Sequence, residues 1–103
     1  MEDRSKMNIE RKLEDGKLVI KVVGRLDTNT SPELEAELGL DGVSDLVFDF
    51  SDLEYISSAG LRVLMIAQKS MTAIGGAMAV ANPNTGVKDI FDITGMSSVF
   101  KII

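Results

Sequence analysis

The sequence predicts an α/β fold in which a mixed β-sheet carries packed helices, in the order β-β-α-β-α-β-α-β. Two strand-like segments flank an Asp-Gly pair near the start of the chain. Further along, short apolar segments alternate with helix-forming segments, and a glycine follows each helical segment. A chain of 103 residues is long enough for one hydrophobic core and too short for two. We therefore expect a single domain.

The first two strands are predicted to form a hairpin. Residues 8–14, NIERKLE, set apolar against charged side chains in alternation, and residues 17–24, KLVIKVVG, contain the β-branched residues that favour strands. The Asp15-Gly16 pair between them is typical of a tight hairpin turn. We expect residues 1–7 to form a loose arm and residues 8–103 to form the domain.

A short helix is expected next, and its start has two interpretations. Thr30 and Glu33 have the spacing of a capping box. Alternatively, Ser31 caps the helix and Pro32 occupies its first position. In either case the helix should end near Gly39.

The middle of the chain predicts a strand followed by the longest helix. In residues 44–50, SDLVFDF, alternate positions are apolar, as on the buried face of a strand: Leu46, Phe48 and Phe50. Residues 58–74 are nearly all good helix formers without proline, and Gly75-Gly76 should end the helix.

The last third predicts a strand, a helix and a strand. Residues 76–81, GAMAVA, are short, small and apolar, as in a buried strand. Asn82-Pro83-Asn84 should open a helix that Gly95 closes, and residues 98–103, SVFKII, are expected to form the final strand.

The long helices are expected to cross between parallel strands. Such crossovers are right-handed almost without exception. The helix that begins at Ser58 should therefore start at the carboxyl edge of the sheet, beside the strand that ends at Phe50. Functional sites of open α/β sheets lie along that edge.

The composition excludes several classes of partner and of catalytic site. The net charge of −5 argues against nucleic-acid and anionic-membrane partners, so the expected partner is a protein. The absence of histidine and cysteine excludes Ser-His-Asp and Cys-His catalysis and leaves only carboxylates as metal ligands. We expect no cofactor and no metal. Because no apolar run of about 18 residues and no secretory signal is present, we expect a cytoplasmic protein.

Three segments resemble those of one known family. Residues 47–64, VFDFSDLEYISSAGLRVL, look like the signature of STAS domains, in which a strand, a short loop and a Ser-Ser-(Ala/Ser)-Gly-Leu helix start form the regulatory site. Residues 24–27, GRLD, resemble the family's G-x-L-D after the second strand. Residues 89–96, DIFDITGM, resemble its L-F-D-x-T-G-L helix end. The resemblance covers nearly the whole chain and implies a STAS-type fold.

Within this family the chain is most similar to stand-alone anti-sigma factor antagonists. The resemblance implies that the unphosphorylated protein binds an anti-sigma factor of GHKL kinase type. Phosphorylation of one serine at the helix start then breaks the complex, and a PPM-type serine phosphatase restores it. By motif position that serine is Ser58. Ser57 is the less favoured alternative. It stands where the family often has an aspartate, and this departure keeps it open as a second candidate.

The chain differs from many members of this family at its carboxyl end. Many relatives continue into a last helix after the final strand, whereas this chain stops at Ile103. Without this last helix, one face of the sheet would be exposed.

Ser57 and Ser58 also have a purely structural interpretation. A serine at a helix start accepts a hydrogen bond from an otherwise unpaired backbone N–H and contributes about 1 kcal/mol. Capping explains one of the two serines and is compatible with phosphorylation of the other.

The helix from Ser58 is expected to turn one face to solvent and another to the core. The solvent stripe recurs at three- and four-residue spacing: Ser58, Arg62, Met65, Lys69 and Thr72. The other face contains Leu61, Leu64, Met71 and Ile74. Residues of the stripe as far as Lys69 are candidate partner contacts. Met65 is alternatively an isolated exposed methionine, and Arg62 either reaches back to a phosphate on Ser58 or is an ordinary surface arginine.

Two aspartates complete the candidate site. Asp27 and Asp49 each follow a strand, and the family resemblance places them with Ser58 in a cluster that faces a kinase or partner. Most aspartates at strand ends simply form turns. Asp49 also invites comparison with the phospho-acceptor of receiver domains, but the acidic pair and the lysine that those domains need are missing.

Two other functions are alternatives. The first is a STAS interaction subunit of a transporter or stress-signalling complex that is never phosphorylated. The second is a small hydrolase or phosphotransfer enzyme, which is disfavoured because the sequence has no G-x-S-x-G elbow, phosphate-binding loop or histidine base.

Overall fold

The computed structural model describes residues 7–103, so residues 1–6 of the arm expected at residues 1–7 lie outside the described residues. Met7 was expected to belong to that arm, but it packs into the core with only 4% of its surface exposed. Its place in the strand alternation explains this difference. Met7 falls on the same face as Ile9, which also packs against the core.

The helices and strands follow the predicted order, with one strand and one short 3₁₀ helix added. They are β1 (Asn8–Glu14), β2 (Lys17–Leu26), α1 (Ser31–Glu35), β3 (Asp45–Asp49), β4 (Leu53–Ile56), α2 (Ser58–Ala73), β5 (Ala77–Ala81), α3 (Thr85–Thr94), η1 (Met96–Ser98) and β6 (Lys101–Ile102).

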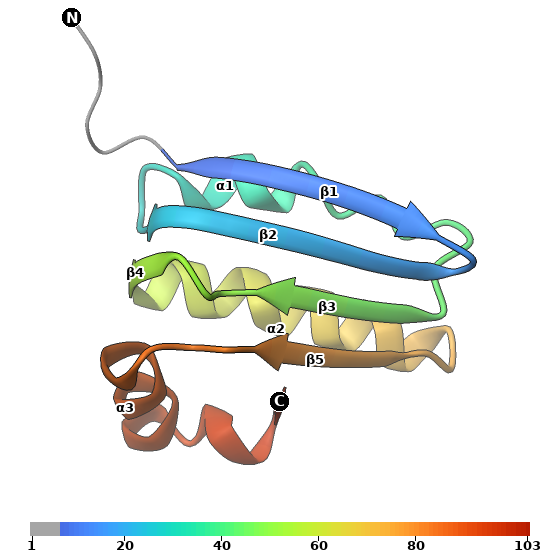
Figure 1. Ribbon diagram of the computed structural model, residues 1–103. Helices are drawn as coiled ribbons and strands as arrows, with labels where there is room; N and C mark the ends of the chain where they lie inside the picture. Colours follow the sequence, from blue (N-terminus) through green and yellow to red (C-terminus); the bar gives the residue numbers. More distant parts are fainter. Residues whose placement is uncertain (1–6) are drawn as a thin grey trace, which may run out of the picture.

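The prediction of a mixed sheet is confirmed. The strand order is β1-β2-β3-β5-β6, in which β1 is antiparallel to β2 and the other pairs are parallel. The long strand β2 continues past the end of β3 and there pairs with β4, also in parallel. The carboxyl ends of β2, β4 and β5 consequently point to one edge of the sheet, as Figure 1 shows.

The core lies between one face of this sheet and the helices. Figure 1 shows α1 and α2 against the same face of the sheet, with α3 below β5. The sheet contributes the buried side chains Leu18, Ile20, Val22, Leu46 and Phe48. Helix α2 contributes Leu61, Leu64, Ala67 and Met71. On the opposite face, called here the open face, Val19, Lys21, Val47 and Asp49 are half-buried and no helix of residues 7–103 covers them.

The start of α1 corrects both capping predictions. Thr30 occupies the N-cap position, but its backbone is already helical (φ −97°, ψ −20°) and its side chain makes no cap bond. Instead, its hydroxyl donates to the carbonyl of Arg25 at 2.8 Å and accepts from the backbone N–H of Asp27 at 2.9 Å. The Ser31 hydroxyl donates to the Asp27 carbonyl. These buried hydroxyls brace the preceding loop, and α1 ends at Glu35 rather than near Gly39.

Strand β4 was not predicted because its burial does not alternate. Leu53 and Ile56 are buried while Glu54 and Tyr55 between them are exposed. A bulge in the pairing with β2, between Gly24 and Arg25, accommodates this irregular pattern.

The final strand is shorter than the sequence indicated. Met96–Ser98 form a turn of 3₁₀ helix, Val99 is 46% exposed, and pairing with β5 begins only at Lys101. The apolar run at the carboxyl end is therefore divided between a turn and a two-residue strand.

Ile74 was expected on the buried face of α2 but is 57% exposed. The helix ends at Ala73, and the next residues form a Schellman turn. In this turn the Gly76 N–H donates to the Met71 carbonyl at 2.8 Å, and Gly75 adopts a φ of +75°. Ile74 leaves the helical path and points to solvent. None of the helices within residues 7–103 has the length and apolar character needed to cross a membrane.

Candidate functional site

The first turn of α2 separates the roles of Ser57 and Ser58. Ser57 is the N-cap in extended conformation, and its Oγ accepts the backbone N–H of Gly60 at 3.3 Å. Its own N–H donates to the Leu26 carbonyl at 2.9 Å, and the residue is half-buried. Ser58 is the first helical residue and is exposed, and no residue within 7–103 hydrogen-bonds to its hydroxyl. Capping therefore occupies Ser57 and leaves Ser58 free.

Gly60 brings this helix start against the sheet. A Cβ at Gly60 would lie 2.8 Å from Cγ1 of Ile56 and 2.8 Å from Cγ of Leu26. Because such approaches are too close for any side chain, glycine lets the first turn of α2 pack directly on the carboxyl ends of β2 and β4. Ser58 is consequently held at the predicted edge of the sheet.

An arginine and a tyrosine that sequence reasoning missed lie at the same edge. Arg25 of β2 pairs with Tyr55 of β4, and the guanidinium carbon lies 4.4 Å from the centre of the tyrosine ring, as a cation–π contact. Arg25 Nε is also 3.7 Å from Oδ2 of Asp27. Tyr55 is 37% exposed. It could not be placed from the sequence, because β4 was not predicted.

Asp27 organises the loop between β2 and α1. Its Oδ1 accepts the backbone N–H groups of Asn29 at 3.0 Å and Thr30 at 3.1 Å. The Thr30 N–H lowers the pKa of Asp27 most; the Asn29 N–H and the charge of Arg25 lower it further, whereas desolvation opposes them. The structural role predicted for aspartates at strand ends is therefore present. Oδ2 remains turned toward Arg25 at the carboxyl edge.

The predicted solvent stripe of α2 is exposed along its whole length: Ser58, Arg62, Met65, Lys69 and Thr72. Met65 is 40% exposed. At about 1.5 Å of rise per residue, Lys69 lies about 16 Å along the helix axis from Ser58. The stripe extends the surface around Ser58 over most of α2.

The structure corrects the placement of Asp49. Asp49 pairs with Lys21, whereas Ser57 bonds to Leu26, and this difference in register corresponds to about 16 Å of strand at about 3.3 Å per residue. Asp49 also lies on the open face, because Phe48 and Phe50 on either side of it are buried. It does not join Asp27 and Ser58. The unpredicted strand β4 lies between the end of β3 and Ser58 and causes the separation.

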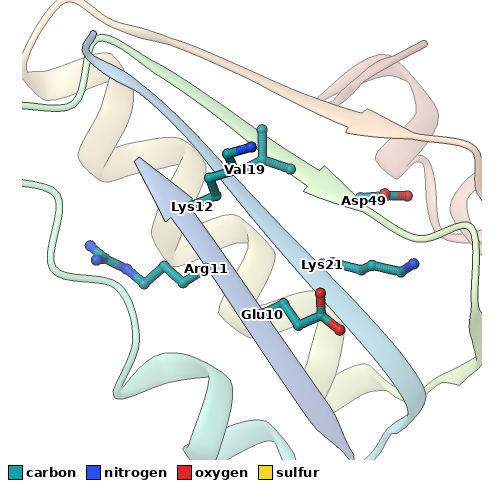
Figure 2. Close-up of a pocket in the computed structure, with 6 residues that line it drawn as sticks. All are labelled: Glu10, Arg11, Lys12, Val19, Lys21 and Asp49. Carbon is teal, nitrogen blue, oxygen red and sulfur yellow. The ribbon is translucent and has the colours of Figure 1, made fainter. Parts of the chain in front are cut away.

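Asp49 instead lines a hollow of about 460 Å³ on the open face, with Glu10, Arg11, Lys12, Val19 and Lys21 (Figure 2). The Ser51 backbone N–H is the main cause of the lowered pKa of Asp49. Lys21 forms an ion pair with Asp52 at 3.1 Å. Within residues 7–103, no three acidic side chains are grouped so that they could hold a metal ion.

Comparisons with known proteins agree with this fold. Residues 8–103 match the family model of the STAS domain. The Bordetella bronchiseptica protein BtrV, named as a candidate anti-sigma factor antagonist, is 33% identical over 91 residues, which cover 85% of this chain and 78% of BtrV.

Two solved proteins have the same fold. An anti-sigma factor antagonist from Mycobacterium paratuberculosis is 25% identical, with a TM-score of 0.86 over 99% of this chain and 89% of its own. Unphosphorylated SpoIIAA, also an anti-sigma factor antagonist, is 18% identical, with a TM-score of 0.82 over 93% of this chain and 88% of its own. The phosphorylated form of SpoIIAA, from Bacillus, has a TM-score of 0.74 at 17% identity, over 93% of this chain and 91% of its own.

Proposed function

Because this chain belongs to the STAS domain family, we propose that it is an anti-sigma factor antagonist. In this proposal the unphosphorylated chain binds an anti-sigma factor, and phosphorylation of Ser58 ends the complex. The role is regulatory, it is carried out in the cytoplasm, and the partner is a protein.

The observation that carries the proposal is the free hydroxyl of Ser58. It is exposed at the first helical position of α2, at the carboxyl edge of the sheet, while Ser57 is used as the cap. A kinase needs an accessible hydroxyl. Phosphorylation of Ser57 would also remove the Oγ contact to Gly60, so Ser58 is the better acceptor.

The surface around Ser58 supports a protein partner. Arg25, Asp27 and Tyr55 lie on one side of it, and the exposed stripe of α2 extends from the other side through Arg62. Met65 and Lys69 continue this stripe. A polar and aromatic rim of this kind suits a reversible interface.

Electrostatics is sufficient for the switch. A phosphate adds about −1.5 to −2 charges. At about 4 Å and an effective dielectric constant of about 20, one added unit charge beside a partner carboxylate costs on the order of 4 kcal/mol before screening. A hundredfold loss of affinity requires only about 2.7 kcal/mol. Repulsion can therefore release the partner.

The domain should keep its fold when Ser58 is phosphorylated. A phosphate at a helix N-terminus is favoured by the helix dipole and by unpaired backbone N–H groups. Arg62 stands four residues later, the spacing at which two side chains on a helix meet. The occurrence of this fold in both forms of SpoIIAA is consistent with a modification that leaves the fold intact.

For the enzymes we propose a GHKL-type anti-sigma factor kinase as partner and a PPM-type serine phosphatase that reverses the reaction. The test combines the chain with such a kinase and ATP, followed by mass spectrometry of the modified peptide. We expect phosphate on Ser58. Absence of labelling on both Ser57 and Ser58 would instead favour an interaction subunit that is never phosphorylated.

Binding measurements test the switch itself. We expect Ser58→Ala to bind the anti-sigma factor as the wild type does and Ser58→Asp to bind at least tenfold more weakly. Ser97→Asp adds the same charge at an exposed position of η1, away from α2, and serves as the matched control. Equal affinity of the wild type and both Ser58 variants would contradict the proposal.

A further inference from the structure

Strand β1 forms an open edge of the sheet. It pairs with β2 on one side, and no strand of residues 7–103 pairs with its other side. Figure 1 shows β1 at the upper border of the sheet, whereas α2 lies behind β3 and β5. A seven-residue edge strand presents a row of backbone groups that can pair with another strand.

The hairpin determines which backbone groups point outward. The turn consists of Asp15 (φ +50°) and Gly16 (φ +83°), as in a type I′ turn, and closes on the pair Glu14 and Lys17. A two-residue hairpin closes on a hydrogen-bonded pair, and such pairs alternate along an antiparallel ladder. The backbone groups of Ile9, Arg11 and Leu13 consequently point away from β2.

We propose that this edge pairs with β1 of a second copy of the chain. In an antiparallel pair centred on Arg11, Ile9 of each copy stands opposite Leu13 of the other. The outward N–H and C=O groups of Ile9, Arg11 and Leu13 then all meet partners. The two sheets form one continuous sheet with their helices on the same side.

The side chains of β1 are self-complementary in this register. On the open face, Glu10 of each copy faces Lys12 of the other, which gives two pairs of opposite charge. On the helix face, Ile9 meets Leu13, which is 46% exposed in the isolated chain. Cross-strand pairs of both kinds stabilise antiparallel sheets.

Arg11 is the one residue of β1 that stands opposite the same residue of the other copy. Its guanidinium donates to the carbonyl of Gly39 at 2.6 Å, in the loop after α1. Figure 2 shows the Arg11 side chain extending past the outer side of β1, away from β2. This contact holds the guanidinium on a backbone carbonyl of its own copy.

Neighbouring registers are poorer. A shift in one direction places Glu10 opposite Glu10 of the other copy. A shift in the opposite direction places Lys12 opposite Lys12. Each brings like charges together and shortens the paired segment. In the register centred on Arg11, the open-face charges and the apolar side chains both match, and like charges meet only at Arg11.

The dimer should be weak. One pair of strands buries less than the roughly 1,200–2,000 Å² of a stable interface. We expect association that depends on concentration and that leaves α2, with Ser58, uncovered. The inference is therefore independent of the proposed function.

Charge exchange tests the register. By sedimentation equilibrium, Glu10→Lys and Lys12→Glu should each weaken dimerisation about tenfold, because both open-face pairs become repulsive. The double variant E10K/K12E should restore it. An equimolar mixture of the two single variants should form heterodimers, since all facing charges are then opposite.

Three further measurements make the test decisive. Lys88→Glu changes a charge on α3, away from β1, and should leave dimerisation unchanged. Circular dichroism of every variant separates loss of pairing from loss of fold. In a mixed-label sample, nuclear Overhauser contacts should join Ile9 of one copy to Leu13 of the other. A chain that stays monomeric at millimolar concentration, or a dimer that is indifferent to these exchanges, would overturn the proposal.

Discussion

At the scale of single residues, the candidate site depends on a division of labour between neighbours. Ser57 caps α2 and is half-buried, so its hydroxyl is already used by the fold. Ser58 begins the helix, and its hydroxyl makes no hydrogen bond within the part of the chain that the structure describes. Gly60 permits both, because it allows the first turn of α2 to rest on Leu26 and Ile56.

Gly60→Ala should therefore destabilise the domain. The added methyl group would lie 2.8 Å from side-chain atoms of Leu26 and Ile56, both of which are buried. Overpacking of this kind costs about 1–3 kcal/mol. Urea denaturation should show the loss as a lower midpoint.

Gly86→Ala is the matched control for this substitution. It also lies in the first turn of a helix, but its added Cβ would meet only Oδ1 of Asn84 at 3.5 Å. We expect it to be neutral or to stabilise by up to about 1 kcal/mol. Equal effects at the two glycines would show that helix propensity, not contact with the sheet, determines the choice of glycine at Gly60.

At the scale of elements, the sequence predicted long and regular segments well and short irregular ones poorly. Strand β3 and helix α2 have clear periods, so their faces were predicted correctly except for Ile74 at the helix end. Strand β4 is four residues long and its pairing with β2 contains a bulge, so no period reveals it.

Because β4 was not predicted, only part of the candidate site could be predicted from the sequence. Ser58 and the stripe of α2 were placed correctly at the surface, because they follow from helical spacing. Asp49 was placed wrongly, because the register of β3 on β2 depends on tertiary pairing. Arg25 and Tyr55 meet only through the pairing of β2 with β4, and thus were missed.

Asn84 connects two of these elements and offers a test of how β4 is held. Its Oδ1 caps α3 by accepting the Val87 N–H at 2.8 Å, and its Nδ2 donates to the Leu53 carbonyl of β4 at 3.0 Å. Asn84→Asp keeps the cap but loses the donor. Since Asp and Asn cap equally well, the loss reports the bond to β4, about 0.5–1.5 kcal/mol.

Asn84→Ala removes both contacts and should cost about 1 kcal/mol more. Chemical denaturation gives both values, and hydrogen exchange at β4 shows where the change acts. If Asn84→Asp matched the wild type in both measurements, the contact with Leu53 would contribute nothing to the position of β4.

At the scale of the whole molecule, the sheet separates three surfaces. The carboxyl edge carries Ser58 and its neighbours, the outer side of β1 is free to pair, and the open face is covered by no helix within residues 7–103. The partner proposed for the carboxyl edge and the second copy proposed for β1 would therefore occupy separate surfaces. Because the charged side chains of the open face are held by local contacts, such as Lys21 with Asp52, they also contribute to the pH dependence of folding.

The directions of the pKa shifts determine that pH dependence. Asp27 and Asp49 both have a pKa below the ordinary value of 3.8, chiefly because of backbone N–H groups of Thr30 and Ser51. Their contribution to stability is complete above that value and is lost as pH falls through the lower folded pKa values. Lys21 has a pKa raised above 10.5, chiefly by its hydrogen bond to Asp52, so its contribution is present below 10.5 and is lost at higher pH.

The free energy of unfolding should accordingly be level near neutral pH and fall below about pH 4. The double variant D27N/D49N keeps an acceptor oxygen at each position but cannot be protonated there. It should be less stable than the wild type at pH 7, and the difference should shrink as the wild type takes up protons in acid. Urea denaturation at a series of pH values between 7 and 2.5 measures both curves. Parallel curves would mean that the loops after β2 and β3 do not depend on the charge of these carboxylates, and that acid unfolding begins elsewhere in the molecule.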